Sequence, residues 1–363
     1  MKIVIRVDAS IEIGIGHVMR CLTLADALKE INAQIEFICF NHKGNLIDFI
    51  QSKGFKVHLI DSSNTNLKNY DYENNKSNNE ISYTSWLGQS QEHDATLCKK
   101  IVQNIMPDWI IIDHYAIDNI WHKKMRDVSK NLMVIDDLAD RSYDCDILLD
   151  QTHGRNHQSY QNLIPDYCKM LLGSKYSILR PEFARLREFS LKRRKNFQLK
   201  KLLITLGGSD VNNITGRVLE SLKNCELRED TDITVVMGSS AIHTDTVKKK
   251  ALDLPFNVEV KSDIKNMAEL MANSDFAIGA SGSTTWERSC LGLPTIQIEL
   301  AKNQKMISQF MDKARAAICI DVNQINQMNM HIIKLKKNIN NLIKRSSKLT
   351  DGSGVNEVLR FIK

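Results

Sequence analysis

The sequence predicts an α/β protein built from two doubly wound domains of similar size that face each other across a cleft. A length of 363 residues is too great for one ordinary hydrophobic core, which favours two domains. In both halves short strands that are apolar on both sides alternate with helices, the pattern of a parallel sheet covered on both faces. Loops of small and polar residues follow several of these strands, and ligands of such sheets bind beyond the carboxyl ends of the strands.

Both halves show this alternation in chain order. In the first half we predict strands at 2–7, 35–40, 56–60, 109–113, 132–136 and 145–150, with helices at 17–30 and 44–53. In the second half we predict strands at 201–206, 232–237, 257–260, 276–280 and 295–298, the last of which closes the core, with helices at 212–224, 267–273 and 286–291. Two consecutive units of this kind predict two Rossmann-like domains.

Two stretches interrupt the alternation. Residues 189–200 are rich in lysine and arginine, so we expect domains at 1–188 and 201–363 joined by a linker at 189–200. Residues 62–82 are dominated by Asn, Ser, Asp and Tyr and predict a polar surface insertion.

The composition limits the function. No run of about 18 apolar residues occurs, which excludes a membrane-spanning helix, and no export segment starts the chain, so we expect a cytoplasmic protein. The eight cysteines are scattered without a CxxC pair and are expected to be reduced core residues. The net charge of +6 is modest, and no dense basic face with interleaved aromatics indicates nucleic-acid binding. We expect a monomer without cofactor or metal, Asp136-Asp137 being a minor magnesium candidate.

The loop 14–17, Gly-Ile-Gly-His, lies between the first strand and its helix. Gly14 and Gly16 allow a ligand to approach the backbone and free amides attract anions, although two glycines also suit a tight turn. His17 falls in the first turn, where the helix dipole disfavours imidazolium, so it is a candidate general base or simply a helix cap. Asp8, at the end of the strand, could orient an imidazole, hold a water or cap a turn.

Residues 279–287, Gly-Ala-Ser-Gly-Ser-Thr-Thr-Trp-Glu, give the stronger signal. Small residues, hydroxyls and free amides that lead into a helix suit a pyrophosphate, and the contacts would come from Ser281, Gly282, Ser283 and Thr284. Glu287 falls in the first turn of that helix, where it can accept bonds from both ribose hydroxyls or merely complement the helix dipole. The loop as a whole favours a nucleotide.

Further polar residues follow other strands on the same side of their sheets. They are Gly207-Gly208-Ser209-Asp210, Asn303, Gln304, Asp113-His114-Tyr115 and Asp136-Asp137. Each alone is ordinary turn chemistry, but their convergence on one crevice favours a ligand site. Without a metal, a diphosphate would be met by backbone amides and helix ends, with Arg180 as a further candidate.

Several segments carry a resemblance to known families. Residues 261–264, 267, 274–275, 279–287, 291–294 and 303–304 resemble the UDP-binding domain of the GT-B glycosyltransferases, the peptidoglycan GlcNAc transferase group especially. Nearly end to end, the chain is similar to the UDP-2,4-diacetamido-2,4,6-trideoxy-β-L-altropyranose hydrolases of pseudaminic acid biosynthesis. The matching segments are 6–10, 14–21, 86–88, 112–115, 136–137, 145–149, 179–183, 207–210, 282–287 and 351–354.

This resemblance implies a GT-B-like fold and hydrolysis of a UDP-sugar to UDP and the free sugar. His17 would activate a water that attacks the anomeric carbon with inversion. The implied substrate contacts are Tyr115, Arg180 and Asn303 for sugar or phosphates, Ser281–Thr284 for the diphosphate, Glu287 for the ribose, and Ile264 and Met267 near the uracil. Arg180 could equally be a domain-interface residue. Three rival functions fit the same residues: a glycosyltransferase, a silent nucleotide-sugar-binding protein and a UDP-sugar epimerase.

Overall fold

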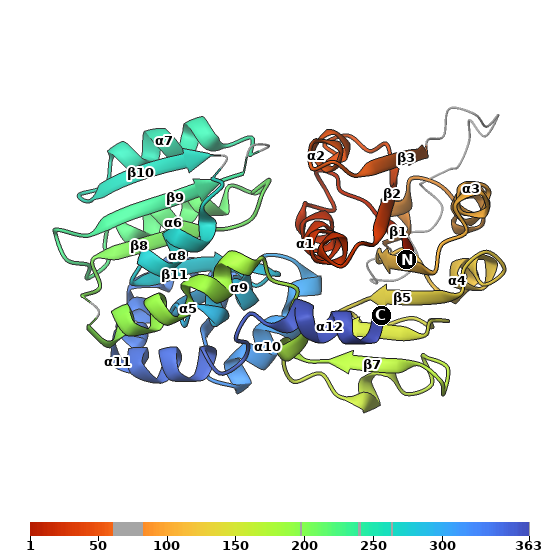
Figure 1. The fold of residues 1–363 in the computed structure, drawn as a ribbon. Coiled ribbons are helices and arrows are strands. Elements are labelled where there is room, and N and C mark those ends of the chain that lie inside the picture. Colours follow the sequence, from red (N-terminus) through yellow and green to blue (C-terminus); the bar gives the residue numbers. More distant parts are fainter. Residues whose placement is uncertain (61–82, 197, 239–240, 263, 363) are drawn as a thin grey trace. The chain divides into compact units, whose positions relative to one another are not determined.

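The computed structural model describes residues 1–60, 83–196, 198–238, 241–262 and 264–362, and the predicted insertion at 62–82 lies outside these ranges. By its internal contacts the chain divides into two compact units. Unit 1 contains Met1–Gln151, Arg155–Gly173 and Val358–Lys363, and unit 2 contains Thr152–Gly154 and Ser174–Glu357. Figure 1 labels many of the elements of both units.

Unit 1 is built on a seven-stranded parallel sheet in the order β3-β2-β1-β4-β5-β6-β7. Its strands are β1 (Lys2–Val7), β2 (Gln34–Phe40), β3 (Lys56–Ile60), β4 (Trp109–Asp113), β5 (Asn131–Ile135), β6 (Ile147–Asp150) and β7 (Lys169–Leu172). Its described helices are α1 (Gly16–Glu30), α2 (Ile47–Ser52), α3 (Gln91–Ile105) and α4 (Asn119–Met125), with 3₁₀ turns η1 (Tyr83–Leu87) and η2 (His157–Tyr160). The strand order reverses between β1 and β4, where such sheets bind ligands.

Unit 2 is built on a six-stranded parallel sheet in the order β10-β9-β8-β11-β12-β13. Its strands are β8 (Lys201–Thr205), β9 (Asp232–Met237), β10 (Asn257–Ser262), β11 (Phe276–Ala280), β12 (Thr295–Glu299) and β13 (Ile318–Asp321). Its described helices are α5 (Pro181–Arg193), α6 (Ile214–Leu222), α7 (Thr244–Leu252), α8 (Met267–Asn273), α9 (Thr284–Cys290), α10 (Lys305–Lys313) and α11 (Met328–Ser346). The strand order reverses between β8 and β11.

Short helical pieces complete the described chain. The 3₁₀ turns of unit 2 are η3 (Ser174–Tyr176), η4 (Arg194–Asn196), η5 (Lys302–Gln304) and η6 (Val322–Gln327). The last helix, α12 (Gly354–Ile362), begins in unit 2 and ends among residues assigned to unit 1. No helix of the described ranges is long and apolar enough to cross a membrane.

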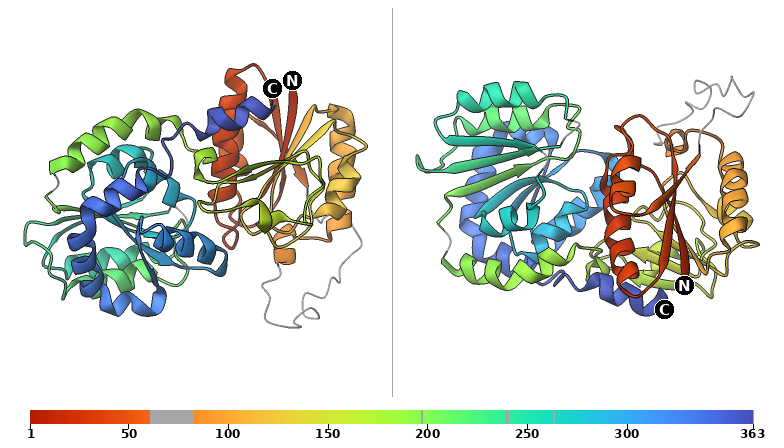
Figure 2. Two further views of the ribbon diagram at one scale, coloured as in Figure 1. Left: turned by 90° about the horizontal axis from the view of Figure 1, so that it is seen from below. Right: turned by 45° about the horizontal axis from the view of Figure 1, so that its top comes forward.

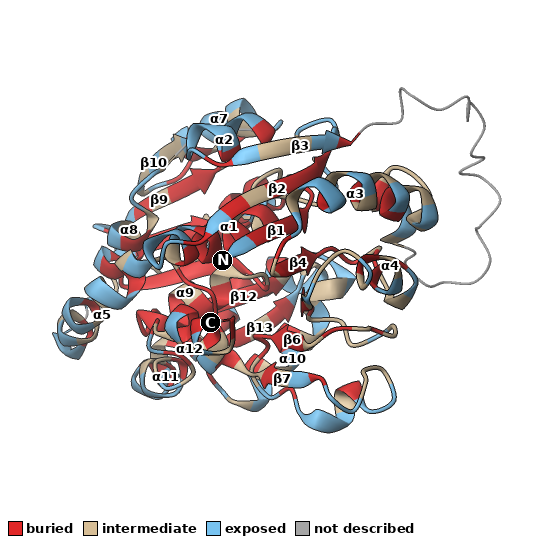
Figure 3. Cartoon of the chain, turned by 45° about the vertical axis from the view of Figure 1, so that its right-hand side comes forward, coloured by how far each residue is buried: buried red, intermediate tan, exposed pale blue. Residues whose placement is uncertain are grey.

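Neighbouring residues of one strand point into two different cores, as a sheet covered on both faces requires. On β8, Leu202 and Ile204 pack with α6, α7 and α11, whereas Leu203 packs with α5, α8 and α9. Helices flank both faces of this sheet in Figure 2, and the strands are largely buried in Figure 3. The predicted doubly wound α/β class is therefore confirmed.

The boundary between the units differs from the prediction. Residues 189–200 are not a free linker, because α5 and η4 belong to unit 2 and Arg194 is buried there. The Arg194 guanidinium donates to the carbonyl oxygens of Leu291, Ser274 and Met271 at 3.0, 2.6 and 2.9 Å. The basic residues that suggested a solvated linker thus anchor a helix, and the units part at Gly173–Ser174 instead.

Two smaller differences concern the edges of the sheets. The predicted closing strand at 295–298 is β12, but β13 pairs with it and forms the edge of the sheet. In unit 1 the edge strand β7 was not predicted. Both missed strands contain only four residues, too few for a clear alternation of apolar and polar side chains.

Candidate functional site

In unit 1 the site residues come from the two strands where the sheet order reverses. β1 leads into the 14–17 loop and α1, and β4 lies beside β1 with Val7 opposite Asp113. His17 and Arg20 are three residues apart on α1, so their side chains share one face of the helix. That face lies against the carboxyl end of β4, where the chain supplies a buried carboxylate, Asp113.

Asp113 binds both side chains of α1. Its Oδ1 lies 2.6 Å from His17 Nδ1, and its two oxygens accept from Arg20 Nη2 and Nε, each at 2.6 Å. Burial alone would raise the pKa of Asp113, but Arg20 and His17 outweigh it and hold that pKa well below its usual range. Asp113 is therefore an ionised carboxylate, and His17 Nδ1 carries the proton that it binds.

This arrangement leaves the other ring nitrogen of His17 available. With Nδ1 protonated, the Nε2 of the neutral ring is a lone-pair acceptor, the form that a general base requires. The Arg20 guanidinium offsets the charge of Asp113, so the carboxylate orients the imidazole without adding net negative charge beside it. His17 is buried, with 8% of its surface exposed.

Aromatic rings and a second carboxylate surround His17. The Tyr115 ring meets it edge-on at a centroid distance of 4.7 Å, and Trp86 stacks on Tyr115 at 5.6 Å. The Tyr115 hydroxyl donates to Asp137, which Arg20 Nη1 contacts at 3.3 Å. Burial, followed by Asp137, raises the pKa of Tyr115 well above its usual value, so Tyr115 is a neutral hydroxyl.

Asp8 does not orient His17, as one interpretation of the sequence suggested. Its Oδ1 accepts from Arg6 Nη1 at 2.6 Å and from the amide of Phe40 at 2.7 Å, and its Oδ2 lies 3.2 Å from His114 Nε2. The His114 Nδ1 accepts from the Ala116 amide at 3.1 Å, so the proton of that neutral ring is on Nε2, the nitrogen nearer to Asp8. Asp8 is thus a buried structural acceptor at the end of β1.

Both carboxylates of the 136–137 pair, the minor magnesium candidate, contact other side chains of unit 1. Asp136 is buried, with its side chain 3.0 Å from Arg141 and accepting from the Ala139 amide at 2.8 Å. Asp137 binds Tyr115 and Arg20, as described above. No cluster of three or more metal-ligating side chains occurs within the described ranges.

The two glycines of the 14–17 loop shape the backbone before α1. Gly14 has a φ of +78°, which favours glycine, and a Cβ there would meet no atom within 4 Å. Its amide donates to the Ser10 carbonyl at 2.9 Å, which closes the turn before α1. Gly16 is the first residue of α1, directly before His17. The open space above Gly14 is compatible with a ligand, and the turn explains the residue as well.

In unit 2 the predicted nucleotide loop links β11 to α9 at the reversal of the strand order. The amide of Ser281 donates to Ile298 and that of Thr285 to Gly282, at 3.0 Å each. No described residue is recorded as accepting from the amides of Gly282, Ser283 and Thr284, so these donors remain available for an anion.

Glu287 and Arg180 meet beside this loop. Glu287 Oε1 lies 3.5 Å from Arg180 Nη2, and Arg180 Nη1 lies 3.1 Å from Glu182. The Glu287 side chain is 17% exposed; its burial raises the pKa of the carboxyl, and Arg180 offsets only part of that effect. Arg180 belongs to unit 2 and contacts Glu287, the residue predicted to bind the ribose.

The remaining predicted residues of unit 2 lie at strand ends, with differing contacts. A Cβ on Gly282 would lie 3.8 Å from Gln304 Nε2, so Gln304 neighbours the loop, and its Oε1 accepts from the Leu300 amide at 3.0 Å. No contact is recorded for the half-buried side chain of Asn303. Gly208 packs against Gly238, whose Cβ would lie 2.0 Å from the Gly208 carbonyl oxygen. Ile264 and Met267 are half-buried beside the core of α8 and α9.

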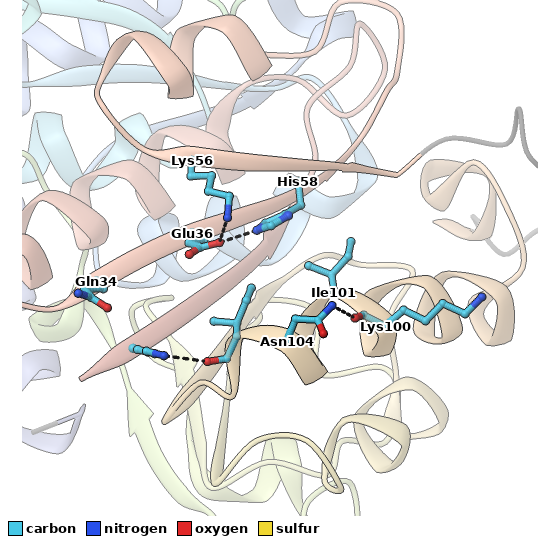
Figure 4. Close-up of a pocket in the computed structure, with 9 residues that line it drawn as sticks. Gln34, Glu36, Lys56, His58, Lys100, Ile101 and Asn104 are labelled. Atoms are coloured by element: carbon cyan, nitrogen blue, oxygen red, sulfur yellow. Dashed lines mark hydrogen bonds and ion pairs between the residues drawn. The ribbon is translucent and has the colours of Figure 1, made fainter.

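A hollow of about 530 Å³ elsewhere on unit 1 is separate from these residues. It lies at the amino ends of the strands, where Lys2, Gln34 and Lys56 begin β1, β2 and β3. Within it Glu36 binds His58 and Lys56 at 2.5 and 3.1 Å, as Figure 4 shows. Lys2 and Asn104 donate to the backbone carbonyls of Ile105 and Lys100. The hollow lies at the end of the sheet opposite to His17.

Several residues of the site had no role in the prediction. Asp113, Arg20 and Trp86 were noted only as parts of motifs, and Asp137 only as part of a motif and of a minor magnesium candidate. One signal was available: the His-x-x-Arg spacing places both side chains on one helical face, and an aspartate ends a neighbouring strand. The distance along the chain between His17 and Asp113 conceals this contact from local patterns.

The chain is similar in sequence and in fold to several known proteins. Residues 202–358 match the glycosyltransferase family 28 C-terminal domain. The chain is 31% identical over 301 residues to the uncharacterized protein MJ1062 of Methanocaldococcus jannaschii, covering 82% of this chain but only 55% of that protein. It is 25% identical over 314 residues to the UDP-2,4-diacetamido-2,4,6-trideoxy-β-L-altropyranose hydrolase of Campylobacter jejuni, covering 86% of this chain and 97% of that one. The solved structure of Acinetobacter baumannii MurG superposes over 99% of both chains with a TM-score of 0.70 at 12% identity.

The contacts of His17 and His114 predict opposite tautomers in one protein. His17 should carry its proton on Nδ1, where Asp113 accepts it, and His114 on Nε2, because its Nδ1 accepts from Ala116. Nitrogen-15 NMR of histidine-labelled protein at neutral pH distinguishes the two forms. In Asp113→Asn the Nδ1 preference of His17 should weaken while His114 is unchanged. A His17 ring protonated on Nε2 in the unsubstituted protein would contradict the geometry.

Proposed function

We propose that this chain, whose residues 202–358 match the glycosyltransferase family 28 C-terminal domain and whose fold is similar to that of MurG, hydrolyses a UDP-sugar to UDP and the free sugar. The specific substrate that we propose is UDP-2,4-diacetamido-2,4,6-trideoxy-β-L-altropyranose, the one named for the Campylobacter jejuni relative. The observation that carries the proposal is the contact between His17 Nδ1 and Asp113, which leaves Nε2 of His17 as a base that can take a proton from water. Hydrolysis needs only such a base and a water.

The nucleotide is assigned to unit 2. The free amides of Gly282, Ser283 and Thr284 would bind the diphosphate, and the Glu287 carboxylate would accept from the ribose hydroxyls. Arg180 holds Glu287 and adds a positive charge at the same place. The uracil would lie against Ile264 and Met267, with Asn303 and Gln304 toward the distal phosphate or sugar.

The reacting carbon is assigned to unit 1. Water gives a proton to His17 Nε2 while its oxygen attacks the anomeric carbon. The bond from that carbon to the β-phosphate oxygen breaks, its electron pair leaves with UDP, and the sugar configuration inverts. Asp113 stabilises the imidazolium that forms, and the proton then passes to solvent. The loop amides of unit 2 stabilise the charge on the departing diphosphate.

The surroundings of His17 suit the proposed sugar. Trp86 and Tyr115 present an apolar aromatic surface, and a trideoxy sugar with a methyl group at C6 exposes more apolar surface than an ordinary hexose. Asp137, which binds Tyr115 and Arg20, adds a carboxylate that can accept from a sugar hydroxyl or amide. These are reasons for choosing a modified sugar as substrate, and the enzyme is proposed to act as a monomer without metal.

A glycosyltransferase is the second candidate function, favoured by the family 28 domain and the fold. It requires an acceptor, whereas the hydrolase does not, so UDP release from the UDP-sugar alone separates the two. An epimerase would leave a changed UDP-sugar, and a silent binding protein would leave the substrate intact.

Substitution of His17 tests the proposed base. Unsubstituted enzyme should release UDP from the proposed UDP-sugar without acceptor, and His17→Asn should lower turnover by about 10²–10⁴-fold, the usual contribution of general-base catalysis. The Kd for UDP, measured by calorimetry, should change little because His17 lies in unit 1. His157→Asn, at an exposed histidine, is the matched control. Near-normal turnover in His17→Asn excludes this residue as the base, and no UDP release without acceptor excludes the hydrolase.

The Glu287 carboxyl predicts how nucleoside binding depends on pH. Burial raises its pKa, so as the pH falls this group takes up a proton earlier than an ordinary glutamic acid with a pKa of about 4.3. Only the carboxylate accepts strongly from both ribose hydroxyls, so affinity for uridine should be greatest above that raised pKa and decline below it. Uridine is used because its lack of phosphates removes their own titration. Glu287→Gln should bind weakly at every pH, and exposed Glu188→Gln should behave as the unsubstituted protein does. A decline that persists in Glu287→Gln would assign it to another group.

A further inference from the structure

A buried guanidinium lies directly beneath the loop of unit 2. Arg288, on α9, is 2% exposed. It donates from Nη1 to the Thr284 hydroxyl at 2.9 Å, and from Nη2 to the Ala280 carbonyl at 2.6 Å and the Thr285 hydroxyl at 3.3 Å. Its Nε has no hydrogen-bond partner among the described residues. All of its partners are therefore neutral.

This sets Arg288 apart from the buried arginines of unit 1. Arg6 and Arg20 each contact a carboxylate at 2.6 Å, Asp8 and Asp113 respectively. No ion pair of Arg288 is recorded within the described ranges, and the nearby Glu287 is held by Arg180 instead. Burial lowers the pKa of Arg288 to about 10, and the charge of the nearby Glu287 offsets only part of that effect.

The strand β11 has a glycine, Gly279, where the Arg288 guanidinium lies against it. A Cβ on Gly279 would lie 2.5 Å from Arg288 Nη1, so a larger residue on β11 would displace the guanidinium. β12 places Gln297 beside Gly279, and the Gln297 Nε2 and the Ser281 Oγ are also buried without a partner among the described residues. Ser281 begins the loop and Thr284 ends it. The unpartnered Ser281 and Gln297 side chains and the Arg288 guanidinium therefore lie next to the residues predicted to bind the diphosphate.

From these contacts we infer that Arg288 is the buried counter-charge of the nucleotide's diphosphate. Because the Thr284 oxygen accepts from Arg288, its own hydroxyl proton is free to donate outward, to a phosphate oxygen. Arg288 thus acts as a positioning residue: it orients Thr284 and fixes the Ala280 carbonyl, and its charge reaches the ligand through one hydroxyl. The inference rests on the proposed nucleotide site and adds a residue that stabilises the leaving group of the hydrolysis.

The inference has a consequence for stability. Without nucleotide, an uncompensated buried cation is unfavourable, and an apolar residue of similar volume in its place is often neutral or stabilising. Arg194 is the comparison: it is equally buried and its partners are also neutral, but its Nε, Nη1 and Nη2 all donate to carbonyl oxygens, those of Leu291, Ser274 and Met271, whereas the Nε of Arg288 has no partner among the described residues. The hydrogen bonds of Arg194 are complete without a ligand, whereas those of Arg288 are not. Replacement of the two by methionine should therefore have opposite effects.

The experiment compares Arg288→Met with Arg194→Met, each by thermal unfolding without ligand and by calorimetric Kd for UDP and for uridine. Arg288→Met should keep or raise the unfolding temperature, and should reduce the preference for UDP over uridine on the order of 10–100-fold while uridine binding is retained. Arg194→Met should lower the unfolding temperature and keep the preference. Arg288→Gln, also uncharged, repeats the test with a polar side chain, and Arg288→Lys should keep most of the preference.

The outcomes separate the inference from the proposed function. An unchanged preference for UDP in Arg288→Met and Arg288→Gln would overturn the inference, as would a loss of folding in both. If the unsubstituted protein binds neither UDP nor uridine, the proposed nucleotide site itself is wrong. If it prefers UDP but the preference disappears in Arg194→Met and not in Arg288→Met, the counter-charge has been assigned to the wrong arginine.

Discussion

The site in unit 1 depends on one buried carboxylate. Asp113 ends β4 beside β1 and binds His17 and Arg20, two residues on one face of α1. Since the carboxylate is ionised, it determines which nitrogen of His17 holds the proton and which is available for chemistry. Since the guanidinium of Arg20 accompanies it, the site contains a buried ion pair and not a lone charge, which keeps the arrangement tolerable in the interior.

The same constraint on buried charge operates differently in unit 2. In unit 1 Arg6 and Arg20 have carboxylates as permanent partners. In unit 2 Arg288 has neutral partners alone, beneath a loop whose amides are also free. A polar group that a protein leaves unsatisfied in its interior calls for an explanation, such as strain, an ordered water or a ligand that binds there. The proposed diphosphate supplies what the amides and Arg288 both lack, a negative charge.

Much of the fold follows from local sequence patterns, because buried parallel strands are short apolar runs. β1, β9 and β11 begin and end at the predicted residues, and His17 falls in the first turn of α1 as expected. The linker at 189–200 was wrong for a physical reason: charged residues usually indicate solvent, yet Arg194 buries its stem and caps carbonyl groups.

The candidate site could be predicted only in part. The loop at 281–284 was recognisable from its composition, and Glu287 from its place in the helix. The partner of His17 was not, since Asp8 is nearer in sequence and equally acidic, and only the pairing of β1 with β4 brings Asp113 to α1. Arg288 could not be recognised as buried from a sequence in which most charged side chains are exposed.

The central claim is that His17 directs water to the anomeric carbon of a UDP-sugar. Turnover in ¹⁸O-labelled water, followed by prompt mass spectrometry of both products, tests it most directly. The account predicts label in the released sugar and none in UDP, because the bond between carbon and oxygen breaks. Label in the β-phosphate of UDP would place the attack at phosphorus and contradict the account.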